Sequence, residues 1–451
     1  MRNTHFPGRS PVYSTKGLAA TSHPLAAKAA IDILSIGGNA IDAAISAAAV
    51  LAVVEAHSTG VGGDLFCLYK PSSSKDIIAL NASGRAPKAL SLDKLNEVGI
   101  KDAIPFTSPH AVSIPTGVAG WIKLVEDHGS ISLKQILKPA IDCAENGYVV
   151  ADIIADYWER EFDKLSKDDD SKKVFLPSGI PLKAGETHYQ PRLAETLIKI
   201  SEEGRKGFYE GKIAKNMVYT IQNSPIRKGV VNLNDLKNYN AKKRNPLCGK
   251  YREYKVCSAP LPSAGGFSIL QVLGILEEFE LSKDKINDNI YLILEASKHS
   301  YNDRYKYLGD SDFANIKINN LLSKEYLKQI ASKISLNKKI ESKFKINNKF
   351  FTPTSTTHVS IIDTYGNVAS LTSSIENTFG SRLMVNGFLL NNQLSDFNFK
   401  IEKDLFVNNI IEPNKRPLSS MSPTIIFDKN NNVKMVIGSP GGKSIIMYVI
   451  K

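Results

Sequence analysis

The stretch from residue 356 to residue 372 reads Thr-Thr-His-Val-Ser-Ile-Ile-Asp-Thr-Tyr-Gly-Asn-Val-Ala-Ser-Leu-Thr. Two β-branched runs, His358–Ile362 and Asn367–Thr372, flank a turn-forming segment, and this pattern predicts a β-hairpin. The hairpin follows a charged, loop-like segment and begins at Thr356. Further strands are expected at Gly387–Asn391, Thr424–Phe427 and Lys434–Ile437, so the last hundred residues form a strand-rich portion.

Thr356 can carry chemistry because of its position at the start of a strand. A threonine hydroxyl is a poor nucleophile unless a base removes its proton, and the α-amine of an N-terminal threonine is such a base. The reference pKa of an α-amine, about 7.7–8.0, suits proton transfer near neutrality. Thr356 is internal, so this chemistry requires a cut between Ser355 and Thr356. An ordinary threonine-rich strand start is the alternative.

A glycine-rich segment, Gly438-Ser-Pro-Gly-Gly-Lys-Ser444, follows the last predicted strand. A phosphate-binding loop would need glycine at position 437, where the chain has Ile437. The Gly441-Gly442 pair can instead turn backbone N–H groups toward an anion, including the oxyanion of acyl transfer. A plain turn is the alternative.

Polar groups that can hold an amino acid lie between these two segments. Asn391-Asn-Gln-Leu-Ser-Asp-Phe397 supplies amides and a carboxylate, and the hydroxyls of Ser419 and Ser420 follow. Together they offer partners for an ammonium and a carboxylate. Taken singly, each segment is equally compatible with an ordinary polar turn.

Composition and charge exclude several classes of protein. The 451 residues are 42% hydrophobic and 23% charged, which is typical of a soluble globular protein. The net charge is +12, but the lysines around residues 317–349 lack arginines and interleaved aromatic residues, so we expect no nucleic-acid partner. The apolar run Ala43–Val54 is too short to span a membrane and predicts a buried helix. The N-terminus lacks the apolar stretch of a signal peptide, so a cytoplasmic location is expected.

The four cysteines are far apart in the sequence, with no CxxC pair and no metal-binding spacing. We therefore expect all four to be reduced and structural, and we expect no metal ion. The chain divides into a mainly helical portion, residues 1–355, and the strand-rich portion, residues 356–451. A lysine-rich linker at about residues 314–355 ends the first portion. Together the two portions are expected to form one catalytic domain of the α+β class.

In chain order, these pieces resemble the γ-glutamyltranspeptidase family. The resemblance covers nearly the whole chain, and its most specific motif is Pro413-Asn-Lys-Arg-Pro-Leu-Ser-Ser-Met-Ser-Pro423. The other matching motifs are Glu55–Gly63, Leu261–Gly266, Asp303-Arg304 with Leu308-Gly-Asp310, Thr356-Thr-His-x-Ser360, Asn391-Asn-Gln-x-x-Asp396-Phe and Gly438-Ser-Pro-Gly-Gly442.

This resemblance implies a four-layer αββα N-terminal-nucleophile hydrolase that is made as one inactive chain. Thr356 would attack the carbonyl of Ser355 and divide the chain into fragments 1–355 and 356–451, which stay together. The freed α-amine then serves as base for the Thr356 hydroxyl. That hydroxyl takes the acyl group from a γ-glutamyl amide such as glutathione, and water or an amino-acid or peptide acceptor releases it.

The resemblance also implies roles for individual residues. Gly441 and Gly442 match the oxyanion-hole pair, and Thr372 and Ser374 match hydroxyls beside the nucleophile. The matches to substrate-binding positions are Glu376, Gln393 and Asp396 for the ammonium, and Ser419 and Ser420 for the carboxylate. No cofactor, metal or membrane partner is implied.

Three departures from the family pattern keep alternatives open. Ser83 stands where family members carry an arginine that clamps the α-carboxylate. Arg85 lies two residues later, and we expect it to contribute to binding of the substrate carboxylate together with Ser419 and Ser420. Glu376 stands where the family has asparagine, and the chain ends at Lys451, where the family usually continues. The missing arginine favours an acylase for another amide, of glutaryl type, whereas Gln393 and Asp396 favour a γ-glutamyl substrate. The short C-terminus is compatible with an inactive homologue.

Overall fold

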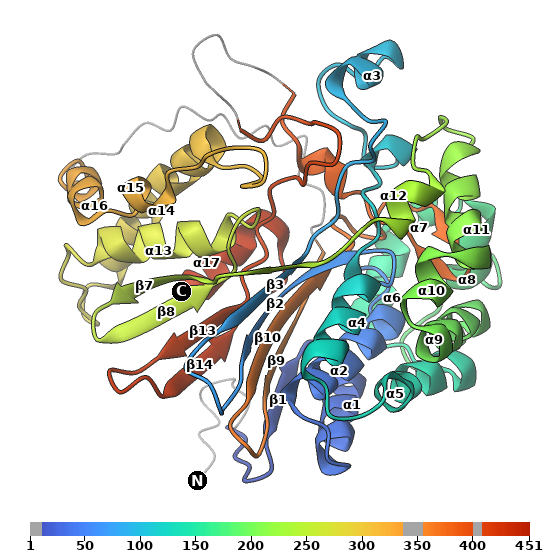
Figure 1. Cartoon of the computed structure of the whole chain (residues 1–451), viewed down its shortest axis with the longest axis horizontal. Helices are drawn as coiled ribbons and strands as arrows, with labels where there is room; N and C mark the ends of the chain where they lie inside the picture. The colour runs from blue at the N-terminus through green and yellow to red at the C-terminus, as the bar shows by residue number, and fades with distance from the viewer. Residues whose placement is uncertain (1–10, 337–354, 400–407) are drawn as a thin grey trace.

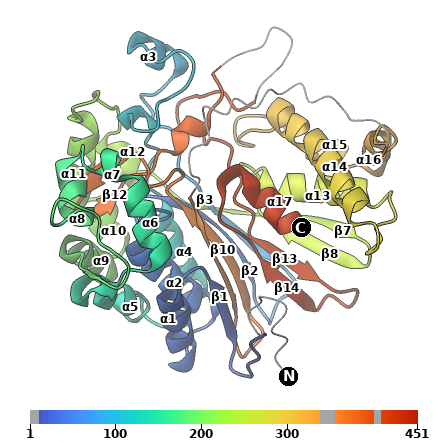
Figure 2. The ribbon, with the colours of Figure 1, turned by 180° about the vertical axis from the view of Figure 1, so that it is seen from behind.

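Two antiparallel β-sheets lie face to face at the centre of the molecule, and each is covered by helices on its outer side (Figures 1 and 2). The computed structural model describes residues 11–336, 355–399 and 408–451. The helix–sheet–sheet–helix order confirms the four-layer αββα arrangement that the sequence predicted.

Both sheets are built from both predicted portions of the chain. The six-stranded sheet has the order β1 (Leu18–Thr21), β9 (Thr357–Ile362), β10 (Val368–Ser374), β2 (Asp64–Lys70), β3 (Ile78–Ala82) and β6 (Lys242–Arg244). The four-stranded sheet has the order β14 (Val433–Ile437), β13 (Thr424–Phe427), β8 (Tyr254–Ser258) and β7 (Leu247–Tyr251). Two small pairs complete the strands: β4 (Tyr148–Val149) with β5 (Thr187–His188), and β11 (Met384–Val385) with β12 (Phe388–Leu389). The two portions therefore form shared sheets, while a division at residue 355 stays a prediction.

Helices form the two outer layers. Beside the six-stranded sheet lie α1 (Pro24–Ser35), α2 (Ala40–Val54), α4 (Gly117–His128), α5 (Leu133–Asn146), α9 (Pro191–Glu203), α10 (Arg205–Tyr209) and α11 (Gly211–Gln222). Beside the four-stranded sheet lie α13 (Gly265–Leu276), α14 (Ile286–Tyr307), α15 (Ile318–Leu321), α16 (Lys324–Ala331) and α17 (Ile445–Ile450). The remaining helices are α3 (Leu92–Glu97), α6 (Asp152–Arg160), α7 (Phe162–Leu165), α8 (Asp169–Phe175) and α12 (Leu233–Lys237).

Helix α2 is the buried helix predicted from the apolar run. All fifteen of its residues are buried, and small alanine side chains let it pack closely on β9 and β10. Asn39 and Asp42 form a capping box at its start. The backbone N–H of Ala40 also donates to Asp363 Oδ2 at 3.0 Å, and Asp363 belongs to the turn between β9 and β10. The predicted hairpin is thus joined to the N-terminus of the central helix, where a carboxylate is electrostatically favoured.

Polar side chains on one face of the β9–β10 hairpin point toward the four-stranded sheet. Ser370 Oγ accepts the backbone N–H of Thr424 at 3.1 Å, and Ser360 Oγ donates to the carbonyl of Val436 at 3.2 Å. Buried polar groups need such partners. These bonds fix the position of the hairpin against the second sheet.

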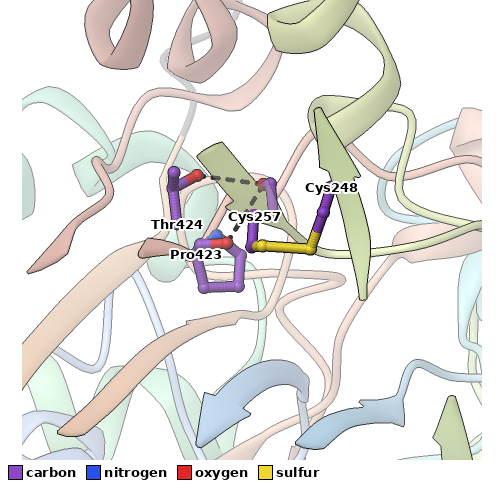
Figure 3. The surroundings of a disulfide bond; sticks show 5 residues. Cys248, Cys257, Pro423 and Thr424 are labelled. Atoms are coloured by element: carbon purple, nitrogen blue, oxygen red, sulfur yellow. Dashed lines mark hydrogen bonds between the residues drawn. A yellow bond between two sulfur atoms is a disulfide. The ribbon is translucent and has the colours of Figure 1, made fainter. Parts of the chain in front are cut away.

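A disulfide joins Cys248 on β7 to Cys257 on β8 (Figure 3). The prediction that all four cysteines are reduced is wrong for this pair, while Cys67 and Cys143 are free. The two residues are direct partners in the antiparallel register, with Cα atoms 4.1 Å apart. Strand register rather than sequence spacing brings them together, so a search for CxxC pairs misses them. Beside Cys257, Ser258 donates to the carbonyl of Pro423 at 3.0 Å, which attaches this hairpin to the most specific family motif.

Two further expectations concern helices. Within residues 11–336, 355–399 and 408–451, no helix is long and apolar enough to cross a membrane. In the predicted lysine-rich linker the structure places α15 and α16, and residues 337–354 lie outside the described residues.

Candidate active site

A cavity of about 890 Å³ gathers residues from both portions of the chain. Most of the residues predicted to bind or transform a substrate line it: Thr356, Ser374, Glu376, Gln393, Asp396, Ser419, Ser420, Gly441 and Gly442. These residues are spread over nearly ninety positions of the sequence, so the fold brings them together as a site.

Thr356 lies immediately before β9 and is almost fully buried. Its Oγ1 is 3.0 Å from the Oγ of Ser374, the last residue of β10. Ser374 Oγ also accepts the backbone N–H of Glu376 at 2.8 Å. The Thr356 hydroxyl thus contacts a serine whose own position is fixed by a backbone hydrogen bond.

The Ser355–Thr356 junction is held in an unusual conformation. Thr356 has a φ of +136°, in a region that β-branched residues rarely adopt. Glu376 opposite it has a φ of +76°, and its carbonyl accepts the hydroxyl of Ser355 at 2.9 Å. Backbone strain of this kind costs on the order of 1–3 kcal/mol and occurs at functional sites. Cleavage of the bond before Thr356 would release that strain.

Gly441 and Gly442 form the turn between β14 and α17. Their φ angles are +124° and +54°, and a Cβ on Gly441 would lie 2.8 Å from the ring of Tyr448. Any other residue at Gly441 would have a strained backbone and would displace the exposed ring of Tyr448. The carbonyl of the next residue, Lys443, accepts the hydroxyl of Tyr301 on α14 at 2.5 Å. This contact holds the turn against the helix.

Three carboxyl groups, Asp64, Glu376 and Asp396, line the cavity. Burial raises the pKa of Asp64 and of Glu376 well above their ordinary values, and the charge of Asp396 raises both further. Burial also raises the pKa of Asp396, opposed by the nearby positive charges of Lys443 and Arg304. Glu376 Oε2 is buried without a hydrogen-bond partner. A substrate ammonium would satisfy these groups and favour their charged forms.

In the amide-containing segment 391–396, some side chains bond to the rest of the fold and others line the cavity. Asn391 donates to the carbonyls of Gly62 and Ser113 at 2.8 and 3.1 Å, so its amide is used within the fold. Gln393 Oε1 accepts the hydroxyl of Ser113 at 2.7 Å and lines the cavity together with Asp396. Ser395 also lines the cavity, but its hydroxyl donates to the carbonyl of Asn392 at 2.7 Å.

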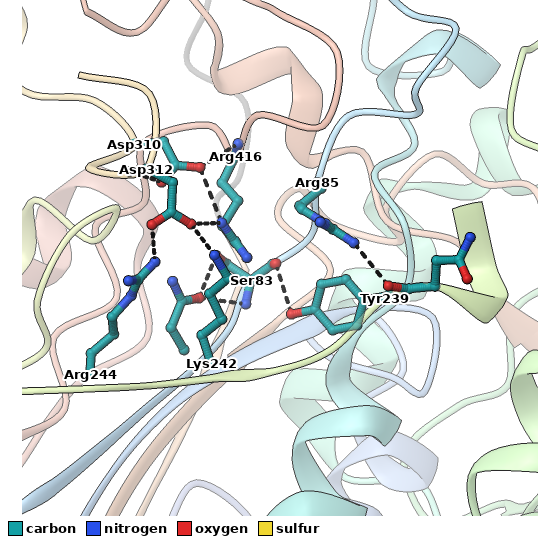
Figure 4. A network of polar contacts seen from close by, with 10 residues as sticks. Ser83, Arg85, Tyr239, Lys242, Arg244, Asp310, Asp312 and Arg416 are labelled. Atoms are coloured by element: carbon teal, nitrogen blue, oxygen red, sulfur yellow. Dashed lines mark hydrogen bonds and ion pairs between the residues drawn. The ribbon is translucent and has the colours of Figure 1, made fainter. Parts of the chain in front are cut away.

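The segment that carries Ser419 and Ser420 is fixed by a buried ion pair (Figure 4). Arg416, 1% exposed, contacts Asp310, 0% exposed, at 3.3 Å and Asp312 at 3.0 Å. The N–H of Ser419 donates to the carbonyl of Pro262 at 3.0 Å. Both hydroxyl-bearing residues therefore sit on an immobilised backbone.

Ser83, Arg85 and Thr372 differ from the other predicted positions in their surroundings. Ser83 lines the cavity, but its hydroxyl donates to Asn81 Oδ1 at 2.7 Å. Arg85 does not line the cavity. Its guanidinium lies 5.2 Å from the ring centre of Tyr239 and donates to the carbonyl of Asn238 (Figure 4). The suggestion that Arg85 contacts the substrate finds no support in this placement.

Thr372 is the third of these positions, and it also lies outside the cavity lining. Its Oγ1 is 2.8 Å from Nδ1 of His358, which burial keeps neutral by lowering its pKa to about 3. Thr372 is on the same face of β10 as Ser374 but lies two residue pairs further along the ladder with β9. Of the two hydroxyls, Ser374 is therefore the one that contacts Thr356.

Sequence reasoning missed several cavity residues, among them Asp64, Tyr157, Arg160 and Lys443. Asp64 directly follows the Gly60–Gly63 cluster, and Lys443 directly follows the Gly441-Gly442 pair. Their positions beside these motifs were the sequence signal available for the two residues. Tyr157 and Arg160 lie on α6 and carry no comparable sequence signal. Among the described residues, no group of three or more His, Cys, Asp or Glu side chains is arranged to hold a metal ion.

The family profile described as Gamma-glutamyltranspeptidase matches residues 26–451. The chain belongs to this family. A "Glutathione hydrolase proenzyme" from Bacillus subtilis (strain 168) is 38% identical over 96% of this chain and 76% of the relative. A protein of the same description from Escherichia coli (strain K12) is 36% identical over 98% of this chain and 78% of the relative. As a member of the gamma-glutamyltranspeptidase family, the protein is an enzyme of the hydrolase and transferase type.

Solved structures of similar fold support the same assignment. A cephalosporin acylase from Bacillus halodurans has a TM-score of 0.89 at 29% identity, covering 100% of this chain and 82% of that one. The gamma-glutamyltranspeptidase of Helicobacter pylori has a TM-score of 0.68 at 33% identity, covering 74% of this chain and 97% of that one. The N-terminal-nucleophile hydrolase fold of this family member is thereby confirmed.

Proposed function

We propose that the protein cleaves itself between Ser355 and Thr356 and then hydrolyses or transfers γ-glutamyl groups of amides such as glutathione. The observation that carries this proposal is the position of Thr356. A strained threonine, hydrogen-bonded to Ser374, shares one cavity with Gly441 and Gly442 and with partners for both charged groups of an amino acid.

In the first reaction, Thr356 Oγ1 attacks the carbonyl carbon of Ser355. The peptide C–N bond breaks, an ester C–O bond forms, and the nitrogen of Thr356 becomes a free amine. Water then hydrolyses the ester to leave the carboxyl group of Ser355 and an N-terminal Thr356. The strained φ of Thr356 favours this reaction because the constraint ends when the bond is cut.

In the second reaction, the new α-amine accepts the proton of Thr356 Oγ1 as the oxygen attacks the γ-carbonyl of the donor. The backbone at Gly441 and Gly442 stabilises the oxyanion that forms. The amine leaving group departs with a proton, and the γ-glutamyl group remains as an ester on Thr356. Water releases glutamate, or the amine of an amino acid or peptide takes the γ-glutamyl group.

Substrate recognition rests on the charges of the cavity. Glu376, Gln393 and Asp396 are the partners proposed for the α-ammonium, and Ser419 and Ser420 those for the α-carboxylate. An acylase for a glutaryl-type amide would not need three carboxyl groups around the place of the ammonium. The relatives described as glutathione hydrolases also favour the γ-glutamyl substrate.

The test begins with purified protein on a denaturing gel, with mass spectrometry of the bands. Fragments 1–355 and 356–451 are expected, and an N-terminal sequence starting at Thr356 identifies the cut. The processed protein should release the chromophore from γ-glutamyl-p-nitroanilide and faster still with a dipeptide acceptor. An intact chain without activity would support the inactive-homologue alternative instead.

The cellular location stays a prediction. The predicted location is the cytoplasm, whereas a disulfide such as Cys248–Cys257 is typical of proteins in oxidising compartments. Cell fractionation, with thiol alkylation before lysis to preserve the redox state of the two cysteines, would decide between these locations.

A further inference from the structure

The carboxylate side of the cavity lacks an arginine in direct contact with the proposed substrate. Ser83 occupies the family's arginine position, and Arg85 is turned toward Tyr239. Two neutral hydroxyls, Ser419 and Ser420, remain for an anionic group. A hydrogen bond between neutral partners is weaker than one assisted by a charge. A cation that contacts one of these hydroxyls would strengthen their hydrogen bonds to a carboxylate.

Arg304 is the cation that contacts one of these hydroxyls. It lies in the last turn of α14, and its NH2 group donates to Ser420 Oγ at 2.9 Å. Its Nε is buried without a hydrogen-bond partner. Arg304 is not among the residues that line the cavity, so it stands behind Ser420 as seen from the substrate.

This contact determines the direction of the serine hydroxyl. A serine oxygen accepts hydrogen bonds and carries a single O–H donor. Because Arg304 donates to the oxygen, the O–H hydrogen is free to point into the cavity. A hydroxyl that accepts from a guanidinium is polarised and becomes a stronger donor to an anion.

We propose that Arg304, acting through Ser420, supplies the positive charge that recognises the α-carboxylate of the donor substrate. Arg304 is thus a positioning residue for specificity, in place of the arginine missing at Ser83. This inference rests on the proposed function and names the residue that discriminates donors with an α-carboxylate from donors without one.

The surroundings of Arg304 fit this role. Its guanidinium lies 5.8 Å from the ring centre of Tyr301, one turn earlier on α14, whose hydroxyl holds the oxyanion turn at Lys443. The positive charge of Arg304 also opposes the rise in the pKa of Asp396, one of the proposed partners of the substrate ammonium. The Arg304 guanidinium therefore acts on both sides of the cavity. It donates to Ser420 on the carboxylate side and favours the charged form of Asp396 on the ammonium side.

The other cations near the cavity have different partners. Arg416 is paired with Asp310 and Asp312, and Arg160 is paired with Asp156 at 2.8 Å on an exposed face of α6. Lys443 lines the cavity, where its charge acts on Glu376 and Asp396. Arg304 is the one of these four that donates to a predicted carboxylate-binding residue.

Two donors that differ only in the α-carboxylate test the proposal. γ-Glutamyl-p-nitroanilide carries both the α-amine and the α-carboxylate, and 4-aminobutyryl-p-nitroanilide keeps the amine alone. We expect the processed, unmodified enzyme to prefer the γ-glutamyl donor. Arg304→Gln should lower kcat/KM for that donor by about tenfold to a hundredfold, mainly through KM. Its kcat/KM for the 4-aminobutyryl donor should change by less than about threefold.

Coupling between the two residues provides a second measurement. Ser420→Ala should cause a similar selective loss, and adding Arg304→Gln to it should lower kcat/KM little further, because Arg304 acts through Ser420.

Arg304→Lys keeps the positive charge but lacks the planar set of N–H donors of a guanidinium, so we expect an intermediate selective loss of kcat/KM for the γ-glutamyl donor. This variant serves as the test if the glutamine variant does not fold. Arg252→Gln is the matched control, since exposed Arg252 also lies over a tyrosine ring, that of Tyr251, and donates to a backbone carbonyl.

Several outcomes would overturn the proposal. An equal loss for both donors in Arg304→Gln, or in Arg304→Lys, would show that Arg304 only shapes the site. Full additivity of Arg304→Gln and Ser420→Ala would show that Arg304 does not act through Ser420. Equal use of both donors by the unmodified enzyme would remove the discrimination itself but leave the proposed γ-glutamyl activity standing. A processed enzyme that cleaves no γ-glutamyl donor would instead contradict the proposed function.

Discussion

The hydroxyl of Thr372 lies 2.8 Å from Nδ1 of His358, and the hydroxyl of Ser374 lies 3.0 Å from that of Thr356. The antiparallel register explains this difference. Thr372 pairs with His358 and Ser373 pairs with Thr357, so the next hydroxyl on the same face, that of Ser374, reaches Thr356. Two residues that the sequence placed together beside the nucleophile therefore have separate partners.

Thr372→Val should reduce stability more than activity. The substitution keeps the volume but leaves a nitrogen of buried His358 without its partner, which costs about 1–3 kcal/mol of unfolding free energy. Chemical denaturation would measure this loss, and cleavage at Ser355 and the turnover number should change only a few-fold. Ser374→Ala should show the opposite pattern, with slow cleavage and low turnover. If the Thr372→Val protein had normal stability but no enzymatic turnover, Thr372 would instead contribute to catalysis beside Thr356.

The parts of the fold that the sequence predicted are those with a strong local pattern. The β-branched runs of the hairpin became β9 and β10, and the apolar alanine-rich run became the buried helix α2. Short strands such as β6 (Lys242–Arg244) carry no such pattern in their sequence. Residues 242–244 form a strand because they pair with β3, and their composition alone does not favour one.

The same distinction applies to the site. Thr356, Gln393 and Asp396 lie within motifs that the family resemblance identifies, and the structure brings them to one cavity. The contact of Arg304 with Ser420 joins residues 116 positions apart, and no spacing rule predicts it. The Cys248–Cys257 disulfide depended on register in the same way.

Thr356→Ala should leave a single uncleaved chain, because the hydroxyl that attacks the carbonyl of Ser355 is absent. Thr356→Ser retains a hydroxyl and should still divide into two fragments, although more slowly. A time course on denaturing gels, with mass spectrometry of each band, measures both variants. If the alanine variant divides at the same bond, another group performs the cleavage.

Substitution of both Gly441 and Gly442 by alanine should reduce turnover far more than substrate binding. Losing a donor to the developing oxyanion typically costs about 10²–10³ in rate. Steady-state kinetics with a γ-glutamyl anilide would separate kcat from KM. Alanine at φ angles of +124° and +54° is strained, so thermal unfolding of the same samples must accompany the kinetics. An unchanged kcat with a raised KM would mean that this turn binds substrate and does not stabilise an oxyanion.

Glu376→Gln should stabilise the unliganded protein increasingly as the pH rises. Burial and the charge of Asp396 raise the pKa of Glu376 in the folded state, so the folded state binds its proton more tightly than the unfolded state. Stability is therefore lost as the pH rises from the unfolded pKa, about 4.3, through the raised folded pKa. Glutamine does not titrate and avoids this loss.

Thermal unfolding at pH 4, 6 and 8 measures the difference between the Glu376→Gln variant and the unmodified protein. The two should differ least at pH 4 and most at pH 8. Glu97→Gln, at an exposed position on α3 paired with Lys94, is the matched control and should show no such trend. A difference that is constant with pH would mean that Glu376 is not destabilised by its charge.

The comparison of γ-glutamyl anilide with glutaryl anilide tests the ammonium side of the cavity. Glutaryl anilide keeps the terminal carboxylate and lacks only the α-amine, so it does not bring the ammonium group that Glu376 and Asp396 are proposed to bind. Unpaired buried charges are costly, and we expect the unmodified enzyme to use the γ-glutamyl donor with the higher kcat/KM. Asp396→Ala should shrink this margin because it removes one partner of the ammonium. Ser83→Ala should leave the margin nearly unchanged, since the Ser83 hydroxyl is already bonded to Asn81. A preference of the unmodified enzyme for glutaryl anilide would replace the γ-glutamyl assignment with an acylase.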